Sequence, residues 1–107
     1  MNTVNKICSI IDEREALDML QEECAELIKA ASKIKRVMNG DCSVDSRKAR
    51  LNLIEELGDV NNMIMLTQAV VLEREEIMEV CTGGAAKLQR YYDRLKEREQ
   101  HGTKMDD

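Results

Sequence analysis

Residues 22–26 read Glu-Glu-Cys-Ala-Glu, and residues 55–59 read Glu-Glu-Leu-Gly-Asp. We call these stretches the first and the second acidic signature. Each lies in a longer segment whose apolar residues recur at helical spacing, where a carboxylate is costly to bury unless a positive charge neutralises it. Because neither signature contains a histidine, a hard cation bound by oxygen ligands is the natural counter-charge. The two signatures therefore predict a pair of helices that hold Mg²⁺ and handle phosphates.

The composition favours one small domain made of long helices. The 107 residues include two tyrosines as the only aromatic residues, no proline and 35% charged residues. A core of Leu, Ile, Val, Met and Ala suits a single domain of this length, and the mixture favours helices packed on one another. We therefore expect an all-α, mostly antiparallel bundle of three main helices plus a short N-terminal helix. Because a helical hairpin alone exposes much apolar surface, we also expect self-association into a homodimer or homotetramer.

Start and stop signals place the expected helices. These are a short leading helix over residues 3–11 that docks through Ile7, Ile10 and Ile11, and long helices over about 13–38, 47–72 and 73–99. Asp12 can cap the first long helix with Glu15 as its capping-box partner, and Asn39-Gly40 ends that helix. Asp45 or Ser46 can cap the second. We expect Gly83-Gly84 to kink or briefly break the third. Residues 1–107 are treated as one domain with a core over about 13–99 and a disordered tail over 100–107.

Placing residues at about 100° per step brings four carboxylates together. The core stripe of the first long helix centres near Ala31, and Glu23 and Glu26 project from adjacent turns on its flank. On the second helix Glu56 and Asp59 form a matching pair. The core stripe there is Leu53, Leu57, Val60, Ile64 and Val71, and Met63, Leu66 and Val70 form a second apolar face beside the acids. Two such pairs on antiparallel neighbours would surround one cavity.

Charge and cysteine usage exclude several classes of function. The net charge of −5 argues against non-specific binding to nucleic acid or to an anionic membrane. A bound divalent metal would still permit a small anionic substrate. The four cysteines have no C-x-x-C spacing, which disfavours a structural zinc site and indicates a reducing compartment. With no recognisable signal peptide or membrane-spanning run, we expect a soluble, cytoplasmic protein.

The two signatures also resemble those of a known family. Glu22-Glu23-x-x-Glu26 followed by Glu56-x-x-Asp59 is similar to the EExxE…ExxD pattern of the MazG-like all-α nucleoside triphosphate pyrophosphatases. The words QEECAELIKAASKI, LIEELGDVNNMI and AAKLQRYYDRLKER extend this resemblance over about residues 13–100, and the last resembles small phage-type members. The resemblance implies hydrolysis of an NTP or dNTP to the monophosphate and pyrophosphate, as in nucleotide-pool housecleaning.

The resemblance implies roles for individual residues as well. It makes Glu23, Glu26, Glu56 and Asp59 the ligands of Mg²⁺, for which Mn²⁺ can substitute. Glu22 and Glu23 would be catalytic, with Glu22 supporting the metal ligands or positioning the attacking water. Lys87, Arg90 and Arg94 resemble the family's basic triphosphate contacts. Asn62 can contact the nucleotide or the metal ligands, or make a structural hydrogen bond between helices.

Other interpretations of the acids remain open. Either signature alone is more often solvated helix surface, and the pairing of the two against apolar stripes is what favours a site. A di-iron carboxylate bundle needs Glu-x-x-His pairs, but Lys29 and Asp59 occupy the positions three residues after Glu26 and Glu56. A different class of function is a non-enzymatic helical adaptor with solvated acidic faces. Its partner surface would be the apolar patch of Met63, Met65 and Leu66.

Overall fold

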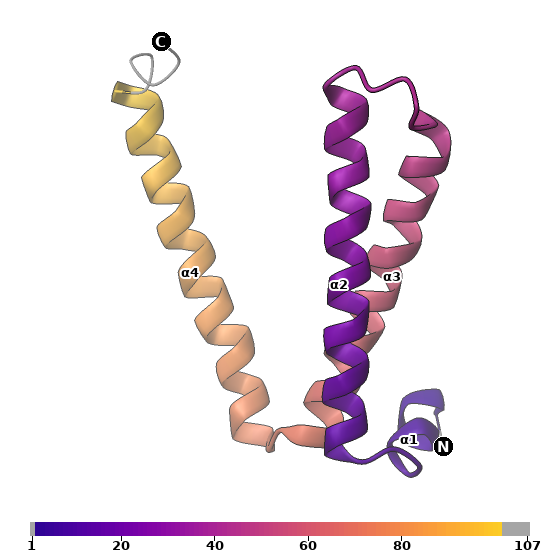
Figure 1. The fold of residues 1–107 in the computed structure, drawn as a ribbon. Helices are drawn as coiled ribbons and strands as arrows, with labels where there is room; N and C mark the ends of the chain where they lie inside the picture. Colours follow the sequence, from indigo (N-terminus) through magenta and orange to yellow (C-terminus); the bar gives the residue numbers. More distant parts are fainter. Residues whose placement is uncertain (1, 102–107) are drawn as a thin grey trace. The chain divides into compact units, whose positions relative to one another are not determined.

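The computed structural model describes residues 2–101, which form four α-helices and no strand (Figure 1). The helices are α1 (Thr3–Cys8), α2 (Glu13–Met38), α3 (Ser46–Val71) and α4 (Arg74–His101). The predicted all-α class is confirmed. None of the described helices is long and apolar enough to cross a membrane. Contacts divide the chain into two compact units, Met1–Leu72 and Glu73–Asp107.

Local hydrogen bonds set the ends of α2 as predicted. The side chain of Asp12 accepts a hydrogen bond of 2.8 Å from the backbone N–H of Glu15, which satisfies a donor that the first turn leaves free. At the other end Gly40 has a φ of 85°, a left-handed conformation that glycine adopts at little cost. The chain therefore leaves the helix at the predicted Asn39-Gly40 stop.

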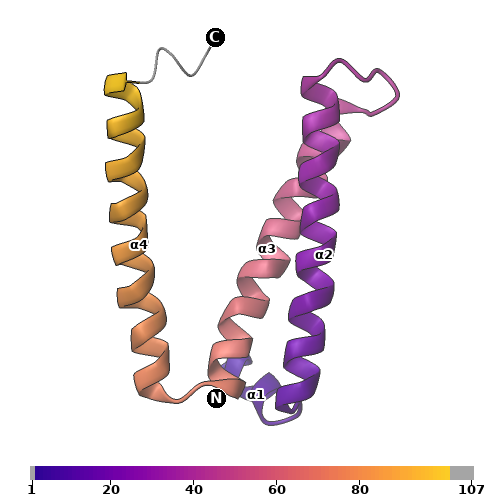
Figure 2. The ribbon, with the colours of Figure 1, turned by 60° about the vertical axis from the view of Figure 1, so that its left-hand side comes forward.

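The α2 and α3 helices run antiparallel and pack along their length (Figures 1 and 2). Asp45 caps α3 by accepting a hydrogen bond of 2.9 Å from the Lys48 N–H. The most deeply buried residues are three alanines, Ala16 and Ala30 on α2 and Ala49 on α3, at 0%, 0% and 2% exposure. Because the distance between packed helices depends on the side chains at the contact, alanines allow a close approach. The rest of the interface is formed by Val60, Met63 and Leu66 together with Glu56.

The buried faces of α2 and α3 differ in part from the predicted core stripes, although Val60, a predicted core residue, is buried at 8% exposure. On α2, Ala30 is buried whereas Ala31, the predicted centre of the core stripe, is exposed. On α3, the predicted core residues Leu57 and Ile64 are 46% and 44% exposed. The buried apolar residues beside the acids are instead Met63 and Leu66, from the face predicted to be secondary. Leu57 and Ile64 therefore lie at the edge of the contact between the helices, while the alanines and the acidic flank lie within it.

The N-terminal helix is shorter than predicted. It packs on α3 but ends at Cys8, and Ile10, a predicted docking residue, is exposed. The Ser9 hydroxyl donates a hydrogen bond of 2.7 Å to the carbonyl of Lys6, and the N–H of Ile10 donates one to the carbonyl of Ile7. Such local bonds offer the backbone an alternative to continued helix.

The second unit contains α4. Leu72 has extended backbone and ends α3, and the N–H of Glu73 donates to Glu76 Oε1 at 2.8 Å, as expected before a new helix. The predicted interruption at Gly83-Gly84 is wrong, because α4 runs through both residues. A helical glycine costs only about 1 kcal/mol relative to alanine, and the residues that follow, Ala85, Ala86 and Lys87, are good helix formers.

The predicted tail also begins too early. Gln100 and His101 are the last two residues of α4, although both were assigned to a disordered tail. The remainder of that predicted tail, residues 102–107, lies outside the described residues.

Candidate metal centre

Three carboxylates from two helices meet between α2 and α3. Glu23 of α2 and Glu56 and Asp59 of α3 each place one oxygen atom within 4.8 Å of the others. Glu56 and Asp59 project from adjacent turns of one helix, and the antiparallel packing brings Glu23 across to them. Oxygen ligands around a hard divalent ion lie about 3 to 4 Å apart, given metal–oxygen distances of about 2.0 to 2.6 Å. The spacing of this acidic cluster therefore fits one cation.

Glu56 is the member whose surroundings are hardest to explain without a cation. Its side chain is 9% exposed, and its Oε1 atom is buried with no hydrogen-bond partner among the described residues. Its Oε2 atom accepts one long hydrogen bond, 3.5 Å from Asn52 Nδ2. Buried polar atoms are nearly always paired, and a buried charge needs a counter-charge. A cation beside this oxygen, or a proton on the carboxyl, would offset the cost of burying the charge.

The electrostatics of the cluster disfavour the ionised form of two of its carboxyls. Burial is the main cause that raises the pKa of Glu56, followed by the negative charge of Asp59 and then that of Glu23. The pKa of Glu23 is raised by burial and then by Asp59, Glu22 and Glu26. Each carboxyl therefore disfavours the charged form of its neighbours. A divalent cation between them would reverse this effect.

Glu26 lies near the acidic cluster but outside the close group. Its Oε2 atom pairs with Lys29 Nζ at 3.2 Å, and both side chains are substantially exposed. An exposed pair of this kind contributes at most about 1 kcal/mol, so it holds Glu26 only weakly. The charge of Glu26 still raises the pKa of Glu23 and of Glu56, which places it within electrostatic reach of both. Of the four predicted ligands, the structure brings three together and leaves this one beside them.

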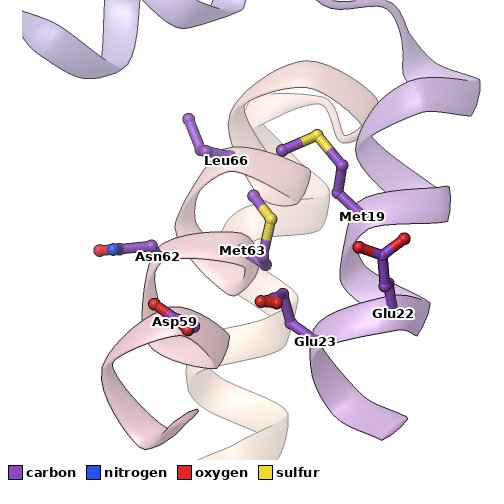
Figure 3. A pocket seen from close by; sticks show the side chains of 7 residues that line it. All are labelled: Met19, Glu22, Glu23, Asp59, Asn62, Met63 and Leu66. Carbon is purple, nitrogen blue, oxygen red and sulfur yellow. The ribbon is translucent and has the colours of Figure 1, made fainter. Parts of the chain in front are cut away.

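A pocket of about 350 Å³ opens next to the cluster (Figure 3). Its lining residues are Met19, Glu22, Glu23, Asp59, Asn62, Met63 and Leu66. In Figure 3, Asn62 projects from α3 away from α2, whereas Glu23 and Met63 lie between the helices. An apolar surface with a few convergent polar groups is typical of small-molecule sites. The predicted residues Glu22 and Asn62 thus share one pocket with Glu23 and Asp59.

Two residues of this region were not among the sequence candidates. Met19 lines the pocket, and Asn52 donates the hydrogen bond to Glu56. Each precedes a cluster carboxylate by four residues, Met19 before Glu23 and Asn52 before Glu56, so each lies one turn away on the same face. That spacing is the signal that could have found them.

The predicted basic contacts belong to the second unit. Lys87, Arg90 and Arg94 lie on α4, where spacings of three and four residues place them on one stripe, and all three are exposed. Tyr91 and Tyr92 are close by on the same helix and are about half exposed.

The apolar patch proposed for an adaptor is largely absent from the surface. Met63 and Leu66 are buried against α2, at 5% and 6% exposure, and only Met65 is substantially exposed, at 46%. The residues that were to form a partner surface therefore belong to the interface that holds the acidic cluster.

Comparisons of the chain with protein-family models, with curated proteins and with solved structures each gave no match.

Proposed function

We propose that this chain is a Mg²⁺-dependent nucleoside triphosphate pyrophosphohydrolase of the MazG-like all-α superfamily, which converts an NTP or dNTP to its monophosphate and pyrophosphate. The observation that carries the proposal is the Glu56 carboxylate. It is 9% exposed and has an unpartnered oxygen, and it lies within 4.8 Å of the carboxylate oxygens of Glu23 and Asp59. Such an arrangement is costly in a metal-free protein and favourable around a cation.

The donor set favours Mg²⁺ and a phosphate substrate. The close group consists of carboxylates alone, and all-oxygen donor sets favour hard cations such as Mg²⁺, Mn²⁺ and Ca²⁺. In proteins Mg²⁺ is usually bound by one or two carboxylates together with substrate phosphates. When bound, it polarises a phosphoryl oxygen and lowers the pKa of a water molecule, so that hydrolysis needs no covalent nucleophile.

Each residue of the acidic cluster and the adjoining pocket has a proposed role in binding or hydrolysis. Glu23, Glu56 and Asp59 hold the ion, and Glu26 joins them by giving up its exposed pair with Lys29. Glu22, at the wall of the pocket, accepts a proton from the attacking water and orients it. Asn62 hydrogen-bonds the nucleotide. The apolar side of the pocket, formed by Met19, Met63 and Leu66, contacts the nucleoside and excludes bulk water.

The exposed basic stripe of α4 is a separate candidate for phosphate contacts, as the resemblance implies. Lys87, Arg90 and Arg94 bind the triphosphate, and the arginines can do so with two parallel hydrogen bonds.

The functional form is proposed to be a homodimer or homotetramer. Several large apolar side chains of the single chain are exposed, among them Leu17, Ile28, Ile54 and Leu57 on α2 and α3 and Met78 and Leu88 on α4. Exposed apolar residues of this number and size are typical of surfaces that bury one another on association. Sedimentation velocity over a range of concentrations tests this, and a monomer at all concentrations would contradict it.

The function is tested by screening common and modified NTPs and dNTPs for release of pyrophosphate, with and without millimolar Mg²⁺. At least one nucleotide is expected to be cleaved only with Mg²⁺. Mg²⁺ is also expected to raise the melting temperature (Tm), because a ligand that binds only the folded state stabilises it. Asp59→Ala should abolish both effects, whereas Glu55→Gln, on the exposed side of the second signature, should keep them. If Mg²⁺ leaves the Tm unchanged and no pyrophosphate is released from any nucleotide, the adaptor interpretation holds instead.

A further inference from the structure

A second pocket lies between the last turns of α2 and the first turns of α3. It has a volume of about 500 Å³ and is lined by Lys33, Arg36, Ser43, Val44, Asp45, Lys48, Ala49 and Asn52. The lining carries three cationic side chains and one carboxylate, in a chain whose net charge is −5. Positive charge is therefore concentrated at this end of the hairpin. We call it the basic pocket.

One cation of the basic pocket is fixed in place and two are free. Arg36 Nη2 lies 2.9 Å from Asp41 Oδ2, and the same guanidinium lies 3.4 Å from the Ser43 hydroxyl. These bonds fix the arginine as one wall of the pocket. Lys33 and Lys48 form no ion pair with any residue between 2 and 101, so both ammonium groups can bind a ligand.

The single carboxylate in the lining already has a partner. Asp45 accepts the hydrogen bond of 2.9 Å from the backbone N–H of Lys48 that caps α3. Beyond its cap, the N-terminus of α3 adds partial positive charge to the same region. The Ser43 hydroxyl already donates to Asp41 Oδ1 at 2.6 Å, so the further side-chain donor in the lining is the Asn52 amide.

The basic pocket and the acidic cluster lie on one side of the hairpin. Met19, Glu26 and Lys33 follow one another at intervals of seven residues on α2, and intervals of seven keep residues on nearly the same face. Asn52, Asp59 and Leu66 do the same on α3. Because the helices are antiparallel, Met19 and Leu66 lie at one end of the hairpin and Lys33 and Asn52 at the other. Along both stripes the side chains therefore change from apolar through acidic to basic or polar towards the α2–α3 loop.

Asn52 connects the two regions directly. It lines the basic pocket, and its Nδ2 atom is 3.5 Å from Glu56 Oε2 in the cluster. Lys48 lies eight residues before Glu56, about 12 Å along α3 at 1.5 Å per residue. A polyphosphate chain and an extended lysine side chain together can span this distance.

We infer that the basic pocket is a phosphate-binding site, in which Lys33, Lys48 and the anchored Arg36 bind phosphoryl oxygens. Lysine and arginine are the side chains that recognise phosphate, arginine by paired hydrogen bonds and lysine as a point charge. The ligand is either the terminal phosphates of a nucleotide whose nucleoside lies at the apolar end of the groove, or free inorganic phosphate. Only the first of these sources rests on the proposed function.

The site is tested by titrating the protein with inorganic pyrophosphate in the presence of EDTA, followed by amide chemical shifts. Without metal, the acidic cluster repels the anion, so activity plays no part in the measurement. The expected shifts are confined to residues 33–52. Lys33→Gln/Lys48→Gln should weaken binding at least fivefold.

A matched variant, Lys35→Gln/Arg47→Gln, decides between a site and diffuse attraction. It also removes two positive charges, from the same ends of α2 and α3. Unlike Lys33 and Lys48, however, Lys35 and Arg47 do not line the basic pocket. This variant should bind as the wild type does. Equal weakening in both double variants, or no shifts in the wild type, would overturn the inference.

A second titration, with ATP in EDTA, identifies the source of the phosphate. Additional shifts at Met19, Met63 and Leu66 would identify the ligand as the terminal phosphates of a nucleotide. Shifts confined to residues 33–52 would identify a site for free phosphate. Both results support the site, and neither requires the chain to hydrolyse nucleotides.

Discussion

Glu23 of α2 and Glu56 of α3 place carboxylate oxygens within 4.8 Å of one another, and the negative charge of Glu23 contributes to the raised pKa of Glu56. Burial is the largest cause of the raised pKa at both residues, and neighbouring negative charges add to it. A helix interface that brings like charges together in this way is weakened when both are ionised. The interface therefore depends on pH and on cations in ways that can be measured.

In the absence of metal, we expect the free energy of unfolding to fall as the pH rises above about 4.5. The folded protein binds protons at Glu23 and Glu56 more tightly than the unfolded chain does, because both pKa values are raised above 4.5. This contribution is present at low pH and is lost as the pH rises through the raised pKa values. Urea unfolding in EDTA, followed from pH 4 to pH 8, measures it. Glu56→Gln should flatten the profile, and a flat wild-type profile would contradict the prediction.

At neutral pH, Mg²⁺ should decide whether the wild type or the Glu56→Gln variant is the more stable protein. In EDTA, Glu56→Gln should melt at a higher temperature than the wild type, because the amide keeps the shape and removes a buried charge beside Glu23 and Asp59. With Mg²⁺ in excess, the wild type should gain stability and the variant should not. Calorimetry under both conditions tests this. Glu55→Gln serves as the control and should respond to Mg²⁺ as the wild type does.

Ala30→Leu should destabilise the hairpin by about 1 to 3 kcal/mol, because a larger side chain at a fully buried position forces α2 and α3 apart. The same change at the neighbouring exposed residue, Ala31→Leu, should alter stability by no more than about 0.5 kcal/mol. Urea unfolding of the two variants compares them. If Ala31→Leu were the more damaging, the packing of the two helices would be other than described.

Asp41 stabilises the α2–α3 loop, and its contribution should vanish at low pH. Its hydrogen bonds with the Ser43 hydroxyl and N–H, followed by that with Arg36, lower its pKa from 3.8 to about 2. Asp41→Asn should therefore be less stable than the wild type above pH 4. The difference should shrink as the pH falls from 3.8 towards 2, since protonation removes the same charge. Unfolding measured at pH 2, 3, 4 and 6 shows whether the two curves converge.

Gly83→Ala should stabilise α4 by about 1 kcal/mol, because the residue lies inside a continuous helix and an added Cβ meets no atom within 4 Å. Circular dichroism during thermal unfolding measures the gain. Gly40→Ala should destabilise the protein instead, because a residue with a Cβ is strained at the φ of 85° that Gly40 adopts. A loss of helix in Gly83→Ala would contradict a continuous α4 at that position and favour the interruption predicted from the sequence.

The resemblance to the MazG-like pattern and the helix geometry select the same carboxylates, but for different reasons. The pattern identifies residue types at fixed spacing, and the spacing of three residues on a helix suffices to make Glu56 and Asp59 neighbours. It does not reveal that Glu56 is buried with an unpartnered oxygen, nor that Glu26 is paired with Lys29. The burial of Glu56 depends on the packing of α3 on α2, which no local spacing contains, whereas the Glu26–Lys29 pair is a contact between adjacent turns of α2.

The sequence by itself determined where the helices of the hairpin begin and end. Asp12, Asn39-Gly40 and Asp45 act through hydrogen bonds and backbone angles within a few residues, so their effect is written in the local sequence. Only the tertiary structure decided which face of each helix is buried. Both α2 and α3 carry more than one apolar stripe, and periodicity cannot choose between them. Close approach through Ala16, Ala30 and Ala49 made that choice, and it turned Glu23, Glu56 and Asp59 towards one another.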